Sequence, residues 1–324
     1  CIRDRVSITA TRTGAGKSPL TLWVARFLID KGHRVAAIRH PMPYGNLKLQ
    51  RVQRFACSQD LDEHECTIEE REEYEPYVHM GIPIYAGVDY QAILEEVQPG
   101  ADIILWDGGN NDFSFIRPDL DIVVVDSLRA GHEIDYFPGE VNFRRADILV
   151  ISKSNSASAD ARLQIREHAA ELNPDAVICS ADLEISVDKP ELMQDQRVLV
   201  IEDGPTVTHG GMSFGAGTVA TQRYNGTPVD PKPYVSGTLK DIFVDNPHLH
   251  QVLPAMGYSE TQRSDLRKAA LRCCEQEKAA CIVDASPAHF DWGLDDQVPV
   301  ARVQYRFVQL DGPPVEQAVL KLIC

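Results

Sequence analysis

The stretch ATRTGAGKS, residues 10–18, decides the fold class because it lies between an apolar segment and an amphipathic one. Before it, Val6, Ile8 and Ala10 alternate as in a short strand. After it, apolar residues recur at helical spacing until Gly32, and these are Leu20, Trp23, Val24, Phe27 and Leu28. A loop of small residues between a strand and a helix lets backbone N–H groups converge on phosphates. The stretch therefore predicts a phosphate-binding loop.

The side chains of this stretch suit a magnesium-bound nucleoside triphosphate. Lys17 supplies a positive charge for the β- and γ-phosphates, and the Ser18 hydroxyl can coordinate Mg²⁺ at the positive end of the helix. The backbone N–H groups expected to face the phosphates belong to Thr13, Gly14, Ala15 and Gly16. Thr11 replaces the first glycine of the motif G-x-x-x-x-G-K-S/T, and an ordinary glycine-rich turn is the alternative interpretation. The flanking strand and helix favour the phosphate-binding loop.

Length and composition describe an acidic globular chain. Its 324 residues suffice for about two domains, and 44% hydrophobic and 25% charged residues are ordinary values. The net charge of −16 argues against binding to nucleic acid, whose phosphates attract basic surfaces. A small phosphorylated ligand needs only a local group of cationic side chains and N–H groups. We therefore expect a small-molecule phosphorylated substrate, and the sequence leaves open whether the chain forms a homo-oligomer.

The sequence shows no targeting or membrane signal. It contains no run of about 18 apolar residues and no basic leader before an apolar stretch, so we expect a cytoplasmic protein that does not bind a membrane. The eight cysteines include no C-x-x-C pair and are expected to be reduced thiols. The chain begins with Cys1 and reaches its first strand within five residues, so we expect it to be a fragment of a longer protein.

Strand-like and helix-like segments alternate along the chain after the loop. Expected strands cover residues 35–38, 82–85, 102–106, 121–126, 147–152 and 176–179, and expected helices cover 88–96 and 157–171. This alternation is typical of an α/β protein. We predict a P-loop NTPase-type, mostly parallel sheet with helices on both faces.

A further α/β region is expected towards the C-terminus. Its strands cover residues 197–202, 281–285 and 300–307, and its helices cover 238–244, 260–277 and 314–323. The polar segment 188–196 is interpreted as a linker, although a surface loop within one continuous sheet fits the same pattern. We therefore divide the chain into a nucleotide-binding domain, residues 1–195, and a substrate-contributing region, residues 196–324.

Asp107 is the second candidate at a phosphate site. In ADIILWDGGNND, residues 101–112, it follows an apolar strand and precedes Gly108 and Gly109. Ligands of parallel sheets bind beyond the carboxyl ends of the strands, and a carboxylate there can hold Mg²⁺ through a water. The two glycines let the backbone approach the γ-phosphate. An Asp-Gly turn is the alternative, but the phosphate-binding loop favours the Mg²⁺ role.

The segment ISKSN, residues 151–155, occupies the strand end where guanine-binding proteins carry Asn/Thr-Lys-x-Asp. Lys153 remains, and its stem is expected under the base, but Ser152 and Asn155 replace the two residues that select guanine. An amide both donates and accepts hydrogen bonds, so the basis for guanine selection is lost. We therefore expect ATP at least as readily as GTP. A plain turn between strand and helix is the alternative.

Two charged runs follow the second strand. Arg39 and His40 lie at its end and begin a basic run that continues to Arg54, and we expect both to contact substrate phosphates. The acidic run CTIEEREEYEP, residues 66–76, is interpreted as a solvated helix face. The functional alternative is a switch-like segment in which one glutamate orients a Mg²⁺-bound water or acts as a base.

Two more segments carry candidate substrate ligands. DSLRAGHE, residues 126–133, and YFPGEVNFRR, residues 136–145, provide Arg129 and Arg144 after another strand end. The glycine-rich segment EDGPTVTHGGMSFGAG, residues 202–217, contains His209 and is expected to form a second anion-binding nest. A flexible loop explains its glycines equally well.

Several strings together resemble the cyclic 2,3-diphosphoglycerate synthetase family. They are TRTGAGKS, RHPMPYG, CTIEEREEYEP, YAGVDY, LWDGGNNDF, PGEVN, EDGPTVTHGGM and LPAMGY, and the likeness extends from about Val6 to about Tyr305. The string RHPMPYG is much more specific than the loop motif. Members of this family have a further α/β domain ahead of the phosphate loop, which is absent from this sequence.

The resemblance implies an ATP-dependent ligase that closes a phosphoanhydride ring. One phosphate of 2,3-diphosphoglycerate attacks the ATP γ-phosphorus, and the other then displaces inorganic phosphate. It implies Lys17 at the γ-phosphate, Ser18 and Asp107 at Mg²⁺, and three arginines at the substrate phosphates, Arg39, Arg129 and Arg144. His40 and His209 are weaker candidates for the same pocket. Lys17, Asp107, Arg39 and Arg129 are the expected catalytic residues.

Three alternatives stay open at this point. Relatives described as GTPases share the pattern, so another phosphorylated substrate is one alternative. A nucleotide-dependent switch or metallochaperone is the second, although the sequence shows neither a guanine-selecting Asp nor a metal-binding Cys/His motif. A phosphate-binding module without turnover is the third.

Overall fold

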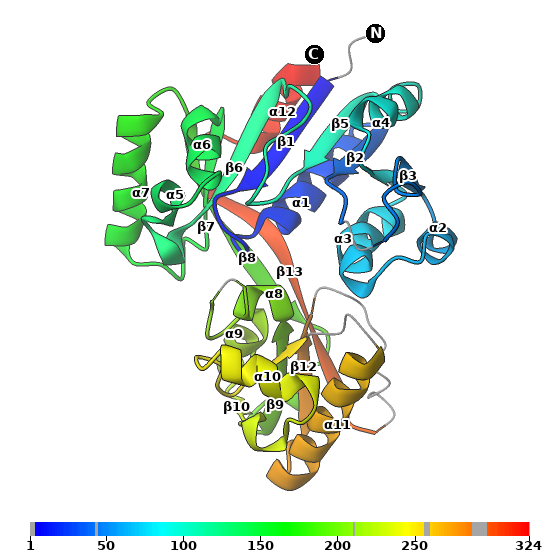
Figure 1. The fold of residues 1–324 in the computed structure, drawn as a ribbon. Coiled ribbons are helices and arrows are strands. Elements are labelled where there is room, and N and C mark those ends of the chain that lie inside the picture. The colour runs from blue at the N-terminus through cyan, green and yellow to red at the C-terminus, as the bar shows by residue number, and fades with distance from the viewer. Residues whose placement is uncertain (1–3, 43–44, 210, 256–259, 287–296, 324) are drawn as a thin grey trace. The chain divides into compact units, whose positions relative to one another are not determined.

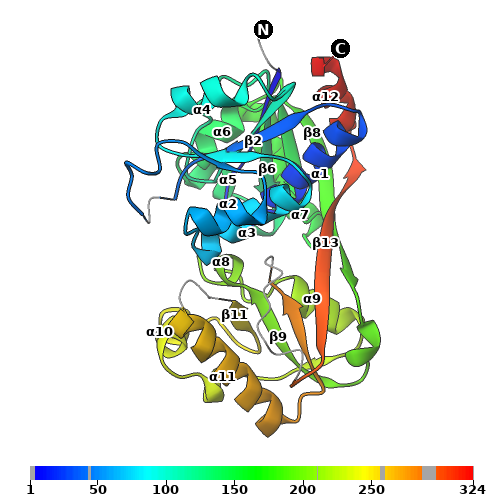
Figure 2. The ribbon, with the colours of Figure 1, turned by 90° about the vertical axis from the view of Figure 1, so that its right-hand side faces the viewer.

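The structure is a computed structural model that describes residues 4–42, 45–209, 211–255, 260–286 and 297–323. The chain forms two compact units, each with its own hydrophobic core (Figures 1 and 2). Unit 1 comprises Cys1–Cys66, Glu73–Glu184 and Arg306–Cys324, and unit 2 comprises Thr67–Glu72 and Ile185–Tyr305. Both units combine strands with helices, so the predicted α/β class is confirmed.

The sheet of unit 1 is parallel through its centre. Its order is β8-β7-β6-β1-β5-β2-β4-β3, in which the pairs from β8 to β4 are parallel and β3–β4 is antiparallel, and β13 (Val300–Asp311) lies beside β8 at the other edge. The strands are β1 (Asp4–Ala10), β2 (Val35–Arg39), β3 (Gln53–Phe55), β4 (Ile84–Ala86), β5 (Ile103–Asp107), β6 (Leu120–Asp126), β7 (Ile148–Ser152) and β8 (Val177–Val187). Strands β5 and β6 are buried along their whole length, as expected for strands covered on both faces.

Helices cover both faces of this sheet. They are α1 (Lys17–Asp30), α2 (Ser58–Glu63), α3 (Ile68–His79), α4 (Tyr90–Val97), α5 (His132–Asp135), α6 (Gly139–Arg145), α7 (Ala159–Leu172) and α12 (Val315–Ile323), with a 3-10 turn η1 (Ser127–Arg129). Alternate residues of β5 face opposite sides: Leu105 packs in one core cluster with Leu20 of α1, and Trp106 packs in another with Ile93 of α4. This alternation places α1 and α4 on opposite faces.

Unit 2 contains a smaller sheet of parallel strands. Its order is β10-β9-β12-β13, and β11 also pairs with β9. The strands are β9 (Arg197–Asp203), β10 (Thr227–Pro228), β11 (Leu253–Ala255), β12 (Cys281–Ala285) and β13 (Val300–Asp311). The helices are α8 (Gly204–Val207), α9 (Ala216–Arg223), α10 (Thr238–Asp245) and α11 (Glu260–Glu277), with 3-10 turns η2 (Pro190–Leu192) and η3 (Lys232–Tyr234).

The compact units differ from the predicted division at residue 196 in three ways. The change from unit 1 to unit 2 falls at Glu184, inside β8, the short segment Thr67–Glu72 belongs to unit 2, and the segment from Arg306 onward belongs to unit 1. The reason for the last difference is the packing of α12, whose Val315 and Val319 are buried in the core of unit 1. An amphipathic helix shows that it has a buried face, but its sequence does not say which sheet that face covers.

The cysteines of the described residues are free thiols, as predicted. Burial raises the pKa values of Cys179, Cys273 and Cys274 to about 12, which keeps these thiols protonated and unreactive at neutral pH.

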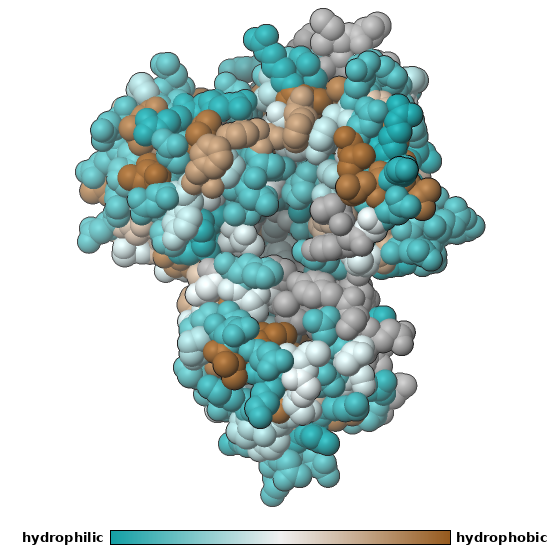
Figure 3. Space-filling view, in the orientation of Figure 1, coloured by the Kyte–Doolittle hydropathy of each residue, from teal (hydrophilic) through white to brown (hydrophobic). Residues whose placement is uncertain are grey.

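On the face in Figure 3, hydrophilic residues predominate and hydrophobic ones form separate clusters. Within the described residues, no helix is both long enough and apolar enough to cross a bilayer.

Candidate active site

The phosphate-binding loop, residues 11–16, joins β1 to α1 as predicted. Gly14 and Gly16 have φ angles of 73° and 96°, which favour glycine. Gly16 is the N-cap of α1, and no side chain caps the first N–H groups of this helix. These groups are therefore free to bind an anion at the positive end of a helix of 14 residues.

Lys17, Asp107 and Arg39 form a buried cluster beside this loop. The Lys17 Nζ atom forms an ion pair with Asp107 Oδ1. Arg39 Nη1 lies 2.9 Å from Asp107 Oδ2, and Arg39 Nη2 lies 2.8 Å from Glu73 Oε1 on α3. Asp107 is 1% exposed and Arg39 is 5% exposed, so these charges interact with little screening by water. Two cations and two carboxylates thus balance one another.

The sheet register explains why these side chains meet. Strand β5 lies between β1 and β2, with Asp107 opposite Ile8 and Trp106 opposite Ile38. Asp107 and Arg39 are the last residues of adjacent parallel strands, and Lys17 follows the loop after the third. Beyond Asp107, Gly108 N donates to Ile8 O at 3.0 Å. A Cβ at Gly108 would lie 2.7 Å from Thr9 Cγ2, so glycine is needed at this position.

Each ionic partner helps to keep the others charged. Burial alone would raise the pKa of Asp107, but Lys17 and Arg39 outweigh it and hold that pKa below its usual value. Burial alone would lower the pKa of Arg39, but Glu73 and Asp107 raise it above its usual value. Burial, and then the charge of Asp107, raise the pKa of Tyr77 on α3 well above the usual value. Asp107 is therefore a carboxylate and Tyr77 a neutral phenol at neutral pH.

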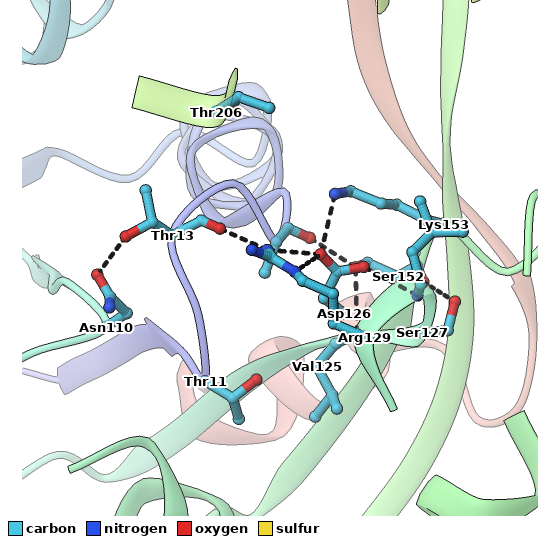
Figure 4. Close-up of polar contacts among 12 residues, drawn as sticks. Thr11, Thr13, Asn110, Val125, Asp126, Ser127, Arg129, Ser152, Lys153 and Thr206 are labelled. Carbon is cyan, nitrogen blue, oxygen red and sulfur yellow. Dashed lines mark hydrogen bonds and ion pairs between the residues drawn. The ribbon is translucent and has the colours of Figure 1, made fainter. Parts of the chain in front are cut away.

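A second ionic group supports the loop from β6 and β7 (Figure 4). Asp126 Oδ2 lies 2.6 Å from Arg129 Nη2 and 3.0 Å from Lys153 Nζ. Arg129 Nη2 also donates to the carbonyl oxygen of Thr13 at 2.5 Å. Burial lowers the pKa of Lys153, and the charge of Asp126 opposes this effect. Asp126 thereby connects two predicted site residues, Arg129 and Lys153, to the phosphate-binding loop.

Two hydroxyl groups fix the loop further. Ser152 Oγ donates to the carbonyl oxygen of Ala15 at 2.5 Å, and Thr13 Oγ1 donates to Asn110 Oδ1 at 2.9 Å (Figure 4). Asn110 follows Asp107 by three residues, so the second contact connects the loop with the segment after β5. The carbonyl groups of the loop are therefore held on one side, which leaves its N–H groups for a ligand.

The remaining candidates of unit 1 do not join either ionic group. His40 Nδ1 lies 2.9 Å from Asp112 Oδ2, in the segment after β5. Arg144 is 45% exposed at its side chain and forms an ion pair with Glu140 on the same helix. Asn155 is exposed, and only its backbone N–H has a contact in the described structure, to Asp182 Oδ2 at 2.8 Å. Their roles at substrate or base stay predictions.

His209 belongs to unit 2 and is exposed. The glycine-rich segment around it was expected to form an anion-binding nest. Such a nest is present at the start of α9, but the carboxylate of Glu202 fills it, accepting from Gly215 N, Gly217 N and Thr218 N at 3.0, 3.1 and 2.7 Å. Glu202 is 1% exposed. A carboxylate of the chain therefore already satisfies these N–H groups.

The acidic run was only partly a solvated face. Residues 68–79 form α3, in which Glu73 pairs with Arg39 while Tyr74 and Tyr77 are buried. Glu73 was not predicted as an individual site residue, because the run of glutamates does not show which of its members meets Arg39. The signal that was present is the period of the two tyrosines, three residues apart on the buried face.

Gly139 positions the loop from outside, and its substitution gives a first prediction. A Cβ at Gly139 would lie 2.7 Å from the carbonyl oxygen of Thr11 and 3.0 Å from Thr11 Cα. Backbone atoms cannot turn away as a flexible side chain can, so Gly139→Ala should displace the loop, cost about 1–3 kcal/mol of stability and weaken ATP binding. Urea unfolding and ATP titration would measure both effects. Gly100→Ala, with 3.8 Å to its nearest contact, is the control.

Comparison with known proteins places this site in a family. The chain is 48% identical over 315 residues to arginine synthetase ArcE of Thermococcus kodakarensis, covering 97% of this chain and 69% of that protein. It is 27% identical over 123 residues to tetraacyldisaccharide 4'-kinase of Dechloromonas aromatica, covering 37% and 34%. The crystal structure of LpxK from Aquifex aeolicus in complex with ATP superposes with a TM-score of 0.50 at 11% identity, covering 100% of this chain and 88% of that one. No protein-family model matches the chain.

The fold, the phosphate-binding loop and these relatives define a P-loop enzyme of synthetase or kinase type. The likeness to LpxK carries the fold alone, because the two sequences share little identity. The relation to the archaeal synthetase is much stronger, since it extends over nearly the whole chain. The chain belongs to the family of arginine synthetase ArcE.

Proposed function

We propose that this chain is an ATP-dependent synthetase that forms the guanidinium group of arginine. The observation that carries the proposal is the 48% identity to a protein named arginine synthetase, over 97% of this chain. Arginine differs from citrulline in one atom of the terminal group, a nitrogen in place of the ureido oxygen. That oxygen leaves poorly as hydroxide, and phosphorylation turns it into phosphate, a good leaving group.

The proposed reaction has two steps. The ureido oxygen of citrulline attacks the γ-phosphorus of ATP, which releases ADP and leaves an O-phosphorylated isourea. Ammonia then adds to the carbon atom, and the C–O bond breaks to release inorganic phosphate. The sum is citrulline, ammonia and ATP giving arginine, ADP and phosphate. The protein needs to position the reactants and neutralise the phosphates rather than form a covalent intermediate.

In this proposal Lys17 binds the phosphates and Arg39 positions Asp107. Lys17 moves its ammonium from Asp107 to the β- and γ-phosphates when ATP binds. Arg39 keeps Asp107 in place through Oδ2 after Lys17 has left Oδ1, because it is itself fixed by Glu73. The positive charge of Lys17 is thus neutralised by Asp107 in the free protein and by the phosphates when ATP is bound.

When Lys17 turns from Asp107 to the phosphates, Asp107 Oδ1 becomes available, and this oxygen suits Mg²⁺. The Ser18 hydroxyl, at the start of α1, would hold the ion directly, and Asp107 Oδ1 would hold one of its waters. Thr21 Oγ1 lies 3.5 Å from the same carboxylate oxygen and can bind that water too. The described residues contain no group of three or more acidic, His or Cys side chains that could hold a metal alone. Phosphate oxygens would therefore complete the coordination.

ATP is the proposed nucleotide. Lys153 projects from the end of β7 with a left-handed φ of 55° and is held by Asp126, which suits a stem lying under a base. Asn155 stands where guanine-binding proteins carry a selective carboxylate, so GTP has no specific advantage. A GTP-dependent switch is the competing proposal.

Formation of cyclic 2,3-diphosphoglycerate is the second candidate reaction, favoured by the resemblance of strings such as RHPMPYG. This reaction has the same two steps, because ADP leaves in the first and inorganic phosphate leaves in the second. In this case Arg39, Arg129, Arg144, His40 and His209 would bind the substrate phosphates. Arg39 and Arg129 are both engaged by buried carboxylates in the free protein, so they would have to exchange partners.

A product assay separates the candidates. The chain, or a longer version of it, is incubated with Mg²⁺ and either ATP or GTP, alone, with citrulline and ammonium, or with 2,3-diphosphoglycerate. We expect ADP and arginine in equal amounts only when citrulline and ammonium are present. Chromatography measures the nucleotide, and amino-acid analysis measures arginine.

The other outcomes decide against the proposal in different ways. A cyclic product from 2,3-diphosphoglycerate would support the second candidate. AMP in place of ADP would contradict transfer of the γ-phosphoryl group. Phosphate release from GTP that neither substrate stimulates would favour a switch.

A further inference from the structure

The phosphate-binding loop carries a cation that the proposed chemistry has not used. The guanidinium carbon of Arg12 lies 4.0 Å from the ring centroid of Tyr136. Its Nε atom is buried and has no hydrogen-bond partner among the described residues. Arg12 forms no ion pair with any residue that the structure describes. Arginines of this kind usually pair with carboxylates, whereas no described carboxylate pairs with Arg12.

His132 adds a second group of the same kind. His132 begins α5, and its ring centroid lies 4.9 Å from that of Tyr136, which follows this helix. The Nδ1 atom is buried, and no described residue bonds it. Burial lowers the pKa of His132, and the nearby charges of Arg12 and Arg129 lower it further. A positive potential therefore surrounds this histidine.

The acidic side chains of this region are mostly directed elsewhere. Glu133 accepts from Gly131 N at 2.8 Å and lies 2.6 Å from His168 Nδ1. Asp126 is engaged by Arg129 and Lys153. Asp135 is exposed, and its opposing effect on the pKa of His132 is smaller than that of the two arginines. Among the described residues, carboxylates thus oppose the positive potential beside the loop only in part.

We propose that Arg12 and His132 bind an anionic group of the second substrate, a carboxylate or a phosphate. The guanidinium of Arg12 offers two parallel N–H groups, the geometry that both anions accept. The ring of Tyr136 holds the guanidinium plane, and cation–π contact keeps it oriented without a carboxylate partner. Arg12 lies in the phosphate-binding loop, five residues before Lys17 at the start of α1, so an anion bound to Arg12 would lie near the nucleotide phosphates.

The proposal deepens the proposed function and rests on it for the identity of the substrate. In the arginine reaction the anion is the carboxylate of citrulline, and in the cyclisation it is a phosphate of 2,3-diphosphoglycerate. In both, the reacting oxygen belongs to the same molecule as the bound anion. Holding that anion at Arg12 would orient the oxygen towards the γ-phosphorus.

The first test separates substrate binding from nucleotide binding. Arg12→Gln should raise the KM of the second substrate about tenfold or more, because a charge-assisted pair of hydrogen bonds is lost, while the Kd of ATP stays within about twofold. Lys31→Gln is the matched control, since Lys31 lies 5.4 Å from the Phe27 ring at the opposite end of α1 and should change neither value. An unchanged KM, or equal losses in KM and ATP affinity, would contradict the proposal.

The second test does not depend on turnover. Ring ¹⁵N signals of His132, assigned by their loss in His132→Gln, are followed while inorganic phosphate or acetate is added to protein saturated with Mg²⁺ and ADP. We expect one of these anions to shift the signals in the wild type and not in Arg12→Gln, with phosphate or acetate indicating which group the site prefers. If neither anion shifts them, or if Arg12→Gln responds like the wild type, the site is refuted. A site that responds here while citrulline and 2,3-diphosphoglycerate give no product would refute the proposed function alone.

Discussion

Replacement of Lys17 by alanine is expected to reduce kcat/KM for ATP by about 10²–10³-fold, because one preorganised charge on the transferred phosphoryl group is lost. The structure gives a physical reason for a second effect. Without nucleotide, the Lys17 ammonium is paired with Asp107, so the variant also lacks the main charge that lowers the pKa of Asp107. Steady-state ADP release measures the first effect, and the pH dependence of urea unfolding measures the second.

The control for this prediction is Lys31→Gln, which removes a lysine from the far end of the same helix. It should leave both measurements unchanged. Lys17→Ala with kcat/KM within about threefold of the wild type would show that the loop does not bind the reacting phosphates. Such a result would leave the family relation intact and remove the basis for the catalytic assignment.

The sequence alone predicted those parts of the site that depend on residues adjacent in the chain. A strand, a loop of small residues and a helix are adjacent in sequence, so residues 10–18 showed the phosphate-binding loop directly. The position of Asp107 beside the loop was predicted because it ends an apolar strand, and parallel strands bring their carboxyl ends to one edge, whereas its role at Mg²⁺ stays a prediction. The same reasoning applied to Arg39. The confirmed elements are those with strong periodicity, such as α11 and β12, which match the expected ranges.

The ionic partners could not be predicted in the same way, because they depend on which segments pack together. Glu73 is 34 residues from Arg39, and only the packing of α3 against the sheet selects it from its neighbours. Asp126 carries the signal that revealed Asp107, a carboxylate at the end of an apolar strand. Its contact with Arg129, three residues later, is seen only in the folded structure.

Two of the cationic side chains predicted at the site contact a carboxylate of the chain in the structure. Arg129 and Lys153 were expected at the substrate and the base, and in the described structure both contact Asp126. A sequence shows that a cation is present at a strand end, but not whether a carboxylate of the chain meets it there. Arg12 of the loop, to which the motif itself assigns no role, is the cation for which the described residues offer no ionic partner.

Replacement of Arg39 by methionine is expected to destabilise unit 1 by about 3–5 kcal/mol, because it leaves the buried carboxylate of Asp107 without one of its two partners. Methionine retains the apolar stem, so loss of packing contributes little. The effect should also depend on pH. Lys17 and Arg39 hold the pKa of Asp107 below its unfolded value of about 3.9, so the wild type keeps this stabilisation at neutral pH and loses it as the pH falls through the folded pKa. In Arg39→Met that pKa rises, and acid unfolding should begin at a higher pH.

The double variant Arg39→Met/Asp107→Asn tests whether the charge on Asp107 causes the loss. An amide has no charge to bury, so the double variant should be more stable than the sum of the two single effects allows, by about 0.5–3 kcal/mol in a double-mutant cycle. Its acid unfolding should also lack the shift of the single variant. Arg34→Met is the control, because Arg34 forms a similar ion pair with Asp102 but its side chain is 58% exposed, and water screens a surface pair so that its loss should change stability little. Additive effects of Arg39 and Asp107 would mean that the pair is not coupled in the folded protein, and Asp107 would then not need Arg39 to stay in place when Lys17 turns to the nucleotide.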